Sequence, residues 1–278
     1  MNLKQVMAVG AVVGGVGCCL AGCGHHVQTV TSKQESVQNS IAASQAAQQS
    51  SLKAAQKHAQ AEQKAMENSL QTKLSAMNYQ SGTSPVVAIN HSQAGLKPKN
   101  WQRPGIFYGG VDQQGRAVHL TTAFFNQAHY QANATPYHYD EHDVPGWHDN
   151  NQQVVQPLIP AMFAHGFNAH GQVSEQTKAP AARDNQYLAT TFASQKLISH
   201  YTQQIQQALQ NGQQVSYQIM PIYHGKDLMS KGVWMQAAGN HGLNFNVYIY
   251  NVQPGWQYNY QTGTGHADPN MKVPEPRN

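Results

Sequence analysis

The chain has 278 residues and a formal net charge of +4 at pH 7, and only 11% of its residues are charged. From residue 101 onward it has nine Lys and Arg against ten Asp and Glu, a balance of −1, so the positive charge lies before that point. Non-specific affinity for nucleic acid comes largely from Lys and Arg contacts to phosphates. This balance therefore excludes constitutive, tight nucleic-acid binding by the C-terminal part of the chain at pH 7.

The first 22 residues predict an export signal, because one lysine precedes an apolar run too short for a comfortable transmembrane span. The run ends in L-A-G-C at Leu20 to Cys23, which matches a lipobox. We therefore expect a lipid-anchored protein, attached to membrane lipid through Cys23 at the extracellular face of the cell membrane. Cleavage removes the other cysteines, Cys18 and Cys19, which excludes a disulfide and a cysteine nucleophile. The Gln-, Asn- and His-rich composition is typical of a Gram-positive surface protein.

Residues 23–80 predict a helical stalk, rich in Ala, Gln, Ser and Lys and with no Pro or Gly between Thr31 and Gln80. Apolar residues recur there at helical steps and form one thin stripe: Leu52, Ala55, Ala59, Met66, Leu70, Leu74 and Met77. A solvated helix and a coiled-coil stalk dimer both fit this stripe. Residues 81–104, with two Gly and three Pro, predict a linker.

A globular domain is expected over residues 105–265, followed by a tail over 266–278. Its first strand is predicted from a regular alternation of side chains. One face of this strand has Val118, Leu120, Thr122 and Phe124, and the other has His119, Thr121 and Ala123. A helix is predicted with an apolar face from Leu197 to Leu209, ending at Asn211 and Gly212. Three strands follow within residues 214–263, bounded by turn signals. This order of elements predicts an α+β domain.

The last strands resemble those of the DNA/RNA non-specific endonucleases, the family of competence DNA-entry nucleases and EssD-like domains of type VII secretion. The family's V-x-Y-x-x-x-P-x-Y, N-F-N-V-x-x-Y-N-x-Q-P-G and Y-x-T-G segments are matched between Val215 and Gly263. Four residues match other scaffold segments of the family: Arg116 in D-x-x-G-R, Trp147 in G-W, Asn185 and Thr190. The resemblance implies a ββα-metal (His-Me finger) nuclease-like domain with an antiparallel sheet, here preceded by the helical stalk.

The resemblance also implies three positions that carry the chemistry, and this sequence differs at each. The family's D-R-G-H-L-I has a histidine that activates water, and Val154 to Ile159 match it with Pro157 at the histidine. Ser194 stands where the family has a metal-binding asparagine, and Thr202 where it has a supporting glutamate. The resemblance therefore implies a nuclease scaffold with a degenerate centre. No cofactor is expected in that case, whereas an active nuclease requires Mg²⁺.

Two other groups of residues are candidates for chemistry. An extended segment over 138–142 places His138, Asp140 and His142 on one face, as in a zinc or manganese site; the alternative is an exposed loop. His165 is the nearest substitute for the missing base, because it lies in an A-H-G string but lacks the preceding Asp-Arg.

Eleven histidines lie beyond residue 101, and most of them become charged at about pH 5. We therefore expect a surface lipoprotein whose degenerate nuclease domain binds DNA or an anionic cell-wall polymer in acid. The alternatives are an active Mg²⁺-dependent endonuclease at the cell surface and a lipoprotein that only binds other proteins, such as a partner in DNA uptake or secretion.

Overall fold

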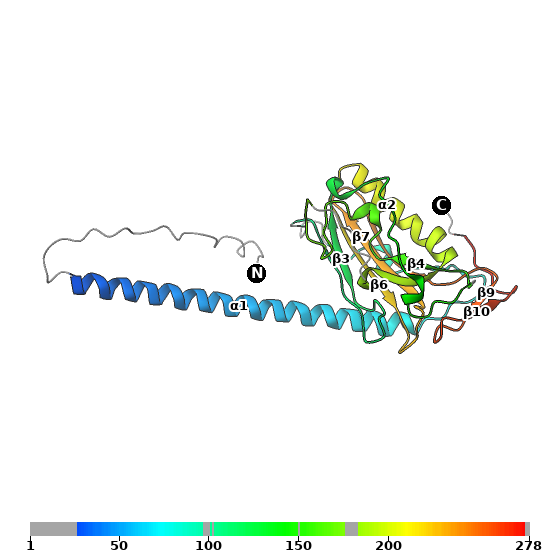
Figure 1. Cartoon of the computed structure of the whole chain (residues 1–278), viewed down its shortest axis with the longest axis horizontal. Coiled ribbons are helices and arrows are strands. Elements are labelled where there is room, and N and C mark those ends of the chain that lie inside the picture. The colour runs from blue at the N-terminus through cyan, green and yellow to red at the C-terminus, as the bar shows by residue number, and fades with distance from the viewer. Residues whose placement is uncertain (1–26, 97–100, 102, 150, 176–182, 276–278) are drawn as a thin grey trace. The chain divides into compact units, whose positions relative to one another are not determined.

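The computed structural model describes residues 27–96, 101, 103–149, 151–175 and 183–275 (Figure 1). The predicted signal peptide and Cys23 lie outside these residues. The chain divides into two units, one up to Glu62 and the other from Gln63 onward. The stalk expected from the sequence corresponds to helix α1 (Val27–Ser75), which runs from the first unit into the second.

In the first unit α1 is a solvated helix. From residue 37 to residue 62 its side chains are exposed except Leu52, which is half-buried, and Val37 and Ile41 are 54% and 50% exposed. Among the helices that the structure describes, none is long and apolar enough to cross a membrane.

The last turns of α1 belong to the second unit. Leu74 is fully buried, and Leu70 and Met77 pack against the same group of side chains. The Lys231 ammonium donates to Ser75 O at 2.9 Å and so satisfies a carbonyl at the C-terminal end of the helix. The end of the predicted apolar stripe is therefore part of the globular core.

The second unit is built on a six-stranded antiparallel sheet with the order β1-β8-β7-β6-β3-β2. Its strands are β1 (Val86–Ala88), β2 (Gly105–Phe107), β3 (Thr121–Phe125), β6 (Val215–Ile222), β7 (Gly232–Gly239) and β8 (Asn244–Tyr250). The three strands predicted near the C-terminus are confirmed as β6, β7 and β8. Their alternation reflects two covered faces, since successive side chains of a strand point to opposite sides.

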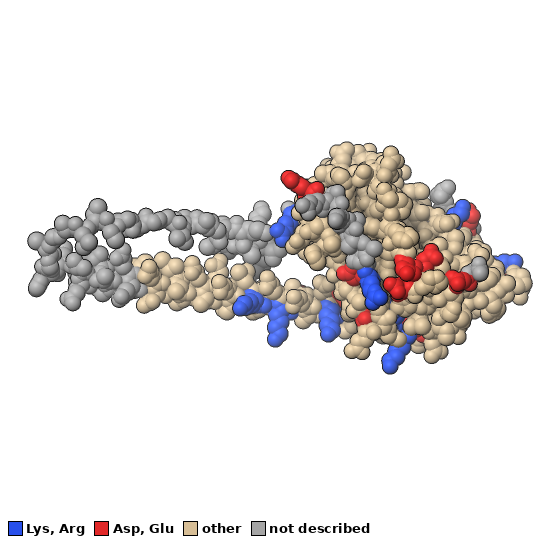
Figure 2. All heavy atoms as spheres, in the orientation of Figure 1, with Lys and Arg blue, Asp and Glu red and all other residues tan. Residues whose placement is uncertain are grey.

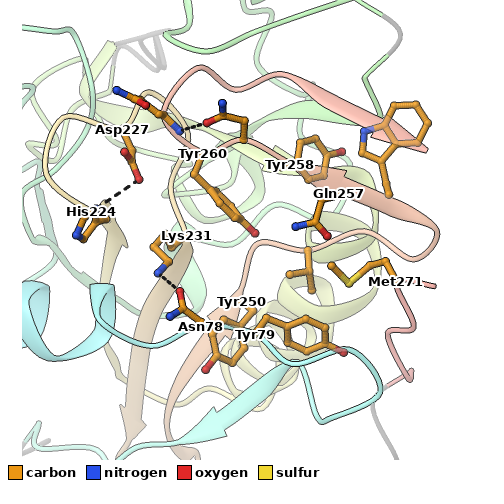
Figure 3. A pocket seen from close by; sticks show the side chains of 14 residues that line it. Asn78, Tyr79, His224, Asp227, Lys231, Tyr250, Gln257, Tyr258, Tyr260 and Met271 are labelled. Carbon is orange, nitrogen blue, oxygen red and sulfur yellow. Dashed lines mark hydrogen bonds and ion pairs between the residues drawn. The ribbon is translucent and has the colours of Figure 1, made fainter. Parts of the chain in front are cut away.

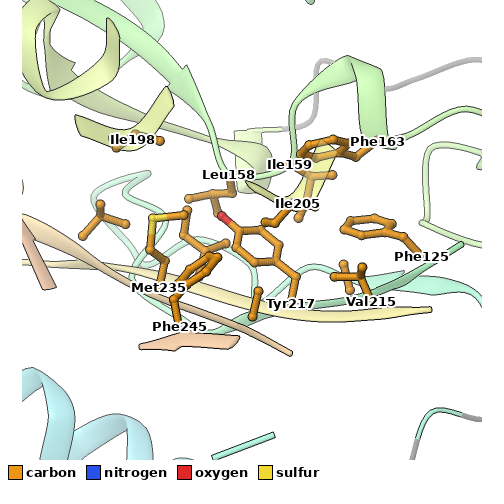
Figure 4. Close-up of a cluster of buried hydrophobic side chains, with 14 of the residues drawn as sticks. Phe125, Leu158, Ile159, Phe163, Ile198, Ile205, Val215, Tyr217, Met235 and Phe245 are labelled. Atoms are coloured by element: carbon orange, nitrogen blue, oxygen red, sulfur yellow. The ribbon is translucent and has the colours of Figure 1, made fainter. Parts of the chain in front are cut away.

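The first face of the sheet carries the main core. Val233, Met235 and Ala237 of β7 point to this face and Trp234 to the other. Helix α2 (Ser199–Gln210), which follows the π-helical η8 (Ala193–Ile198), covers the first face beside β6 and β7 (Figure 1). Figure 4 shows the Tyr217 ring in the middle of this core. The predicted helix and the α+β class are thus confirmed.

Smaller elements complete the unit. A two-stranded sheet is formed by β4 (Gln153–Pro157) and β5 (Gln186–Thr190), and another by β9 (Trp256–Tyr258) and β10 (Gly265–Ala267). The remaining elements are short 3-10 turns: η2 (Asn90–Ser92), η4 (Gln127–His129), η5 (Glu141–Asp143), η6 (Ala161–Phe163) and η7 (Arg183–Asn185).

Three sequence expectations about local structure need correction. The predicted linker 81–104 contains β1, which pairs with β8 at the edge of the main sheet. The first predicted strand begins only at Thr121, and its main-core face carries Ala123 and Phe125 rather than Phe124. His119 precedes that strand and is exposed, with its Nδ1 3.5 Å from the Glu67 carboxylate. The predicted tail also takes part in the fold, since β10 extends into it.

Candidate functional site

The position expected for the nuclease centre is a hairpin followed by a helix. Strands β4 and β5 pair antiparallel, with Gln153 opposite Thr190 and Pro157 opposite Gln186. The chain then enters η8 and α2. This arrangement of two strands and a helix is the order that a ββα-metal centre requires, and it places Pro157 at the end of β4 and Ser194 in the first turn of η8.

Two buried polar side chains hold this unit together. Asn185 is fully buried, accepts a hydrogen bond from Ile159 N at 2.8 Å and donates one to Ile159 O at 3.1 Å. Thr190 is also fully buried; its hydroxyl donates to Val252 O at 2.7 Å and accepts from Ala193 N at 3.0 Å. Buried polar groups need such partners. Asn185 thus ties together the two strands' chain ends at one end of the hairpin, and Thr190 joins the other end to the start of η8 and to the chain after β8.

Pro157 and Ser194, the residues matched to the family's base and metal-binding asparagine, are both hydrogen-bonded to the Gln156 side chain. Ser194 Oγ donates to Gln156 Oε1 at 2.6 Å, and Gln156 Nε2 donates to Pro157 O at 3.1 Å. The Gln156 side chain is therefore folded between the end of β4 and the start of η8, where it is only 9% exposed. Pro157 itself offers no side-chain proton acceptor. The structure thus brings two of the predicted positions together and places an amide between them.

Thr202, the third predicted position, lies on α2 and does not join this pair. Its hydroxyl donates to Ser199 O at 3.0 Å, within its own helix. A threonine hydroxyl bonded in this way to the preceding turn is a common local arrangement in helices. Thr202 therefore has a local hydrogen bond of its own and supplies no carboxylate.

An apolar pocket of about 240 Å³ lies against Pro157. Its lining includes Tyr137, Tyr139, Pro160 and Met162. Burial raises the pKa of Tyr137 to about 12, and burial followed by the neighbouring tyrosines raises that of Tyr139 as well. Both phenols are therefore neutral at physiological pH, and this surface is a poor place for a divalent cation or a phosphate.

The predicted metal cluster at residues 138–142 is wrong. The segment is not extended throughout: Asp140 is the N-cap of the 3-10 turn η5, which holds His142, and the Asp140 carboxylate accepts from His142 N at 3.2 Å. His138 and His142 are exposed. Within the described parts of the chain, no group of three His, Cys, Asp or Glu is placed to hold a metal ion. At the Gln156–Ser194 pair the amide oxygen, which could otherwise serve as a ligand of Mg²⁺, accepts the Ser194 hydroxyl, and neither residue of the pair is a carboxylate.

His165, the substitute base, lies on the surface of the connection between β4 and β5. Its carbonyl, rather than its ring, has a defined role, because it lies 2.9 Å from His129 Nδ1. His129 is buried and stacks on Phe167 at 4.2 Å between ring centroids. Burial lowers the pKa of His129, so its ring stays neutral near pH 7 and donates from Nδ1 to the His165 carbonyl.

The remaining matched residues make structural contacts. Arg116 is 7% exposed, forms an ion pair of 2.6 Å with Asp112, and donates to the carbonyls of Gly225 and Asp227. Its guanidinium also lies 4.7 Å from the centre of the Tyr223 ring. Trp147 donates from Nε1 to Asp149 at 3.2 Å and packs on the small cluster around Val144, Leu188, Met229 and Tyr258.

A second pocket was not predicted from the sequence. It has a volume of about 430 Å³ and is lined by residues from three distant segments (Figure 3). Tyr79 comes from the chain after α1, Lys231 from the connection between β6 and β7, and Tyr260 from the segment after β9. The W-Q-Y-N-Y string at Trp256 to Tyr260 is the one sequence signal for it.

Comparisons with known proteins agree with the fold. No protein-family model matches the sequence, and no curated protein matches it significantly. Among solved structures, the chain is similar to NucA from Streptococcus agalactiae, with magnesium bound or with no metal. Both matches have a TM-score of 0.55 and cover 71% of this chain and 94% of NucA, at 18% and 19% identity. The Sda1 nuclease with bound zinc matches at a TM-score of 0.43 and 13% identity, over 67% of this chain and 98% of that one. The expected nuclease fold is thus confirmed; what the match establishes is the fold.

Proposed function

We propose that this domain is a pseudo-nuclease: it keeps a non-specific nuclease scaffold, lacks the hydrolytic chemistry and acts as a binding module. The hydrogen bond between Ser194 and Gln156 beside Pro157 carries this proposal. Phosphodiester hydrolysis by such a centre needs a base for the attacking water and a metal ion at the scissile phosphate. Pro157 has no side-chain base, and the Ser194 hydroxyl is hydrogen-bonded to the Gln156 amide. These residues therefore supply neither the base nor the metal site.

The fold favours DNA as the ligand, and the charge distribution of the domain favours binding at acid pH. Figure 2 shows acidic and basic side chains side by side on the visible face of the domain, with no extended patch of one sign. Attraction to phosphates is therefore weak when the histidines are neutral. Exposed histidines gain positive charge in acid, and this adds to the charge of the domain without removing the acidic residues. We infer binding to DNA, or to an anionic cell-wall polymer, that strengthens in acid.

The proposed place of action is the outer face of the cell membrane. The L-A-G-C string at Leu20 to Cys23 supports lipid anchoring, and the solvated helix α1 suits a stalk that holds the domain away from the lipid. The same position suits work beside a protein partner in DNA uptake or secretion.

Plasmid degradation and gel retardation by the purified full chain test this proposal. Mg²⁺, Mn²⁺ and EDTA are compared at about pH 7 and at about pH 5. We expect intact plasmid throughout, with retardation that is stronger at the lower pH and weakened by salt. Metal-dependent cleavage would overturn the pseudo-nuclease proposal and favour the active endonuclease, with His165 as the first residue to replace. Intact plasmid with no retardation at either pH would overturn DNA binding.

A further inference from the structure

The pocket in Figure 3 is formed by other elements than the Gln156–Ser194 pair, and neither Gln156 nor Ser194 lines it. In Figure 3, Tyr258 and Tyr260 lie on one side of the space and Tyr79 and Tyr250 on the other. Its volume of about 430 Å³ lies within the range of small-molecule sites. Because the fold brings three separate segments together to make it, the pocket is a property of the folded domain.

Three tyrosine rings of the pocket are fixed in place by their own hydroxyl groups. Tyr258 donates to Asn151 O at 2.6 Å and Tyr260 to Asn251 O at 2.9 Å. Tyr79 has two backbone carbonyls within reach of its hydroxyl, Thr83 O at 2.8 Å and Lys272 O at 2.9 Å. The polar ends of these three rings are thus bound to the protein. What remains for a ligand is apolar ring surface, mainly that of the half-buried Tyr79 and Tyr260, since Tyr258 is buried. Rings held in this way lose little freedom on binding, which favours affinity.

The polar part of the lining consists mainly of amides. Gln257, Asn259 and Gln261 come from β9 and the turn after it, and all three are exposed. An amide side chain both donates and accepts hydrogen bonds. This matches a hydroxyl group, which also does both, better than it matches a phosphate or carboxylate, which only accepts.

The charged residues of the pocket balance each other. Lys231 donates to Ser75 O and, at 2.7 Å, to Asn78 Oδ1, so two of its three N–H groups are already used. Asp227 supplies the opposite charge and lies 3.9 Å from His224. A pocket with one cation and one anion has no net attraction for a polyanion, and this argues against a nucleic-acid strand as its occupant.

We propose that this pocket binds a neutral saccharide, with the apolar face of a sugar ring against the tyrosines and its hydroxyl groups on the amides of Gln257 and Gln261. Burial of apolar ring surface supplies the affinity, and the amides fix the orientation. At a cell surface such a ligand is a unit of a neutral polysaccharide. This inference goes beyond the proposed function, because it concerns another ligand at another site.

Titration of the full chain with soluble neutral oligosaccharides tests the inference. The probes are cellohexaose, maltohexaose and the hexamer of N-acetylglucosamine, with oligothymidine as the anionic comparison, and binding is followed by calorimetry and ligand-observed NMR. We expect saturable binding of at least one saccharide, with a dissociation constant that does not change with salt, since the ligand has no charge. Absence of saturable binding by all three saccharides would overturn the proposal.

Paired glutamine variants locate the binding. Gln257→Ala with Gln261→Ala removes two hydrogen-bonding amides, and we expect binding to weaken about tenfold. The matched control is Gln203→Ala with Gln207→Ala, two exposed glutamines of α2, which should leave binding unchanged. Equal effects of the two pairs, or loss of oligothymidine binding rather than saccharide binding in the first pair, would overturn the assignment. Plasmid retardation by the same variants is measured separately, so failure of this inference and failure of the pseudo-nuclease proposal are distinguishable.

Discussion

Ser194 and Gln156 are joined by a hydrogen bond of 2.6 Å that connects the first turn of η8 to the end of β4. The other end of the amide donates to Pro157 O, so the Gln156 side chain has partners at both its oxygen and its nitrogen. Since the side chain is only 9% exposed, water has little access to replace a lost partner. The pair therefore contributes to stability at the junction between β4 and η8.

Replacing Ser194 by alanine should destabilise the domain. Removal of the hydroxyl leaves Gln156 Oε1 without its partner in a nearly buried place, and we expect a loss of about 1 kcal/mol in the free energy of unfolding, measured with urea. The control is Ser199→Ala, whose hydroxyl bonds to Gln195 O on the exposed side of the same helical segment. A cost for Ser194→Ala no larger than for Ser199→Ala would contradict the role given to the Gln156–Ser194 pair.

The end of α1 should be as important for stability as the sheet it covers. Leu74 is fully buried, whereas Leu52 of the same helix is only half-buried. We expect Leu74→Ala to lower the free energy of unfolding by about 2–5 kcal/mol, because it leaves a cavity against the sheet. Leu52→Ala is the matched control and should cost less than about 1 kcal/mol. Similar small costs at both positions, seen in chemical unfolding, would mean that all of α1 is a solvated stalk.

Strands with a regular alternation and the one amphipathic helix could be predicted from the sequence. In β6, β7 and β8 successive side chains alternate between two buried clusters, one on each face of the sheet, and this alternation is visible in the sequence. The same property explains the error at β3. Leu120 packs on the second face of the sheet and Phe125 on the first. Apolar residues at both even and odd positions are therefore buried, and the alternation does not tell which of them face the main core. β1 has only three residues, and its pairing depends on β8, which lies far along the chain.

The contacts of the candidate site could not be predicted from the sequence. The matched segments led to Pro157 and Ser194, while the amide between them comes from the side chain of Gln156, whose partner lies 38 residues away. The expected metal site failed because Asp140 is an N-cap residue whose carboxylate accepts a backbone N–H. The pocket lined by Tyr79 and Tyr260 could not be foreseen, since these two residues lie far apart in the sequence and come together only in the folded domain.

Replacing Cys23 should release the protein from the membrane. In the proposed lipid anchoring, the L-A-G-C string directs the lipid to this residue, and its acyl chains supply the membrane affinity. We expect Cys23→Ala to move the protein from the membrane fraction and to abolish metabolic labelling with a fatty acid. Cys19→Ala is the control and should leave both unchanged, because Cys19 precedes the cleavage point. Membrane attachment that survives Cys23→Ala would show that another segment holds the protein.

The stability of the domain should fall in acid because of His129. Burial lowers the pKa of His129 in the folded protein by more than its hydrogen bond to the His165 carbonyl raises it. The unfolded chain therefore binds a proton at a pH at which the folded chain does not. The contribution to stability is fully present above the ordinary histidine pKa of about 6.5 and is lost as the pH falls through the lower, folded pKa.

The variant His129→Gln removes this titration and should make the loss of stability between about pH 7.5 and about pH 5 smaller than in the unmodified protein. Thermal unfolding at several pH values measures the difference. His241→Gln, at an exposed turn between β7 and β8, is the control and should keep the original pH dependence. The stacking of His129 on Phe167 is lost in the variant, so only the slope against pH, and not the absolute stability, decides the test. An unchanged slope would place the acid sensitivity elsewhere. In that case the DNA binding proposed for acid would not be opposed by His129, because protonation of its ring would cost the fold little.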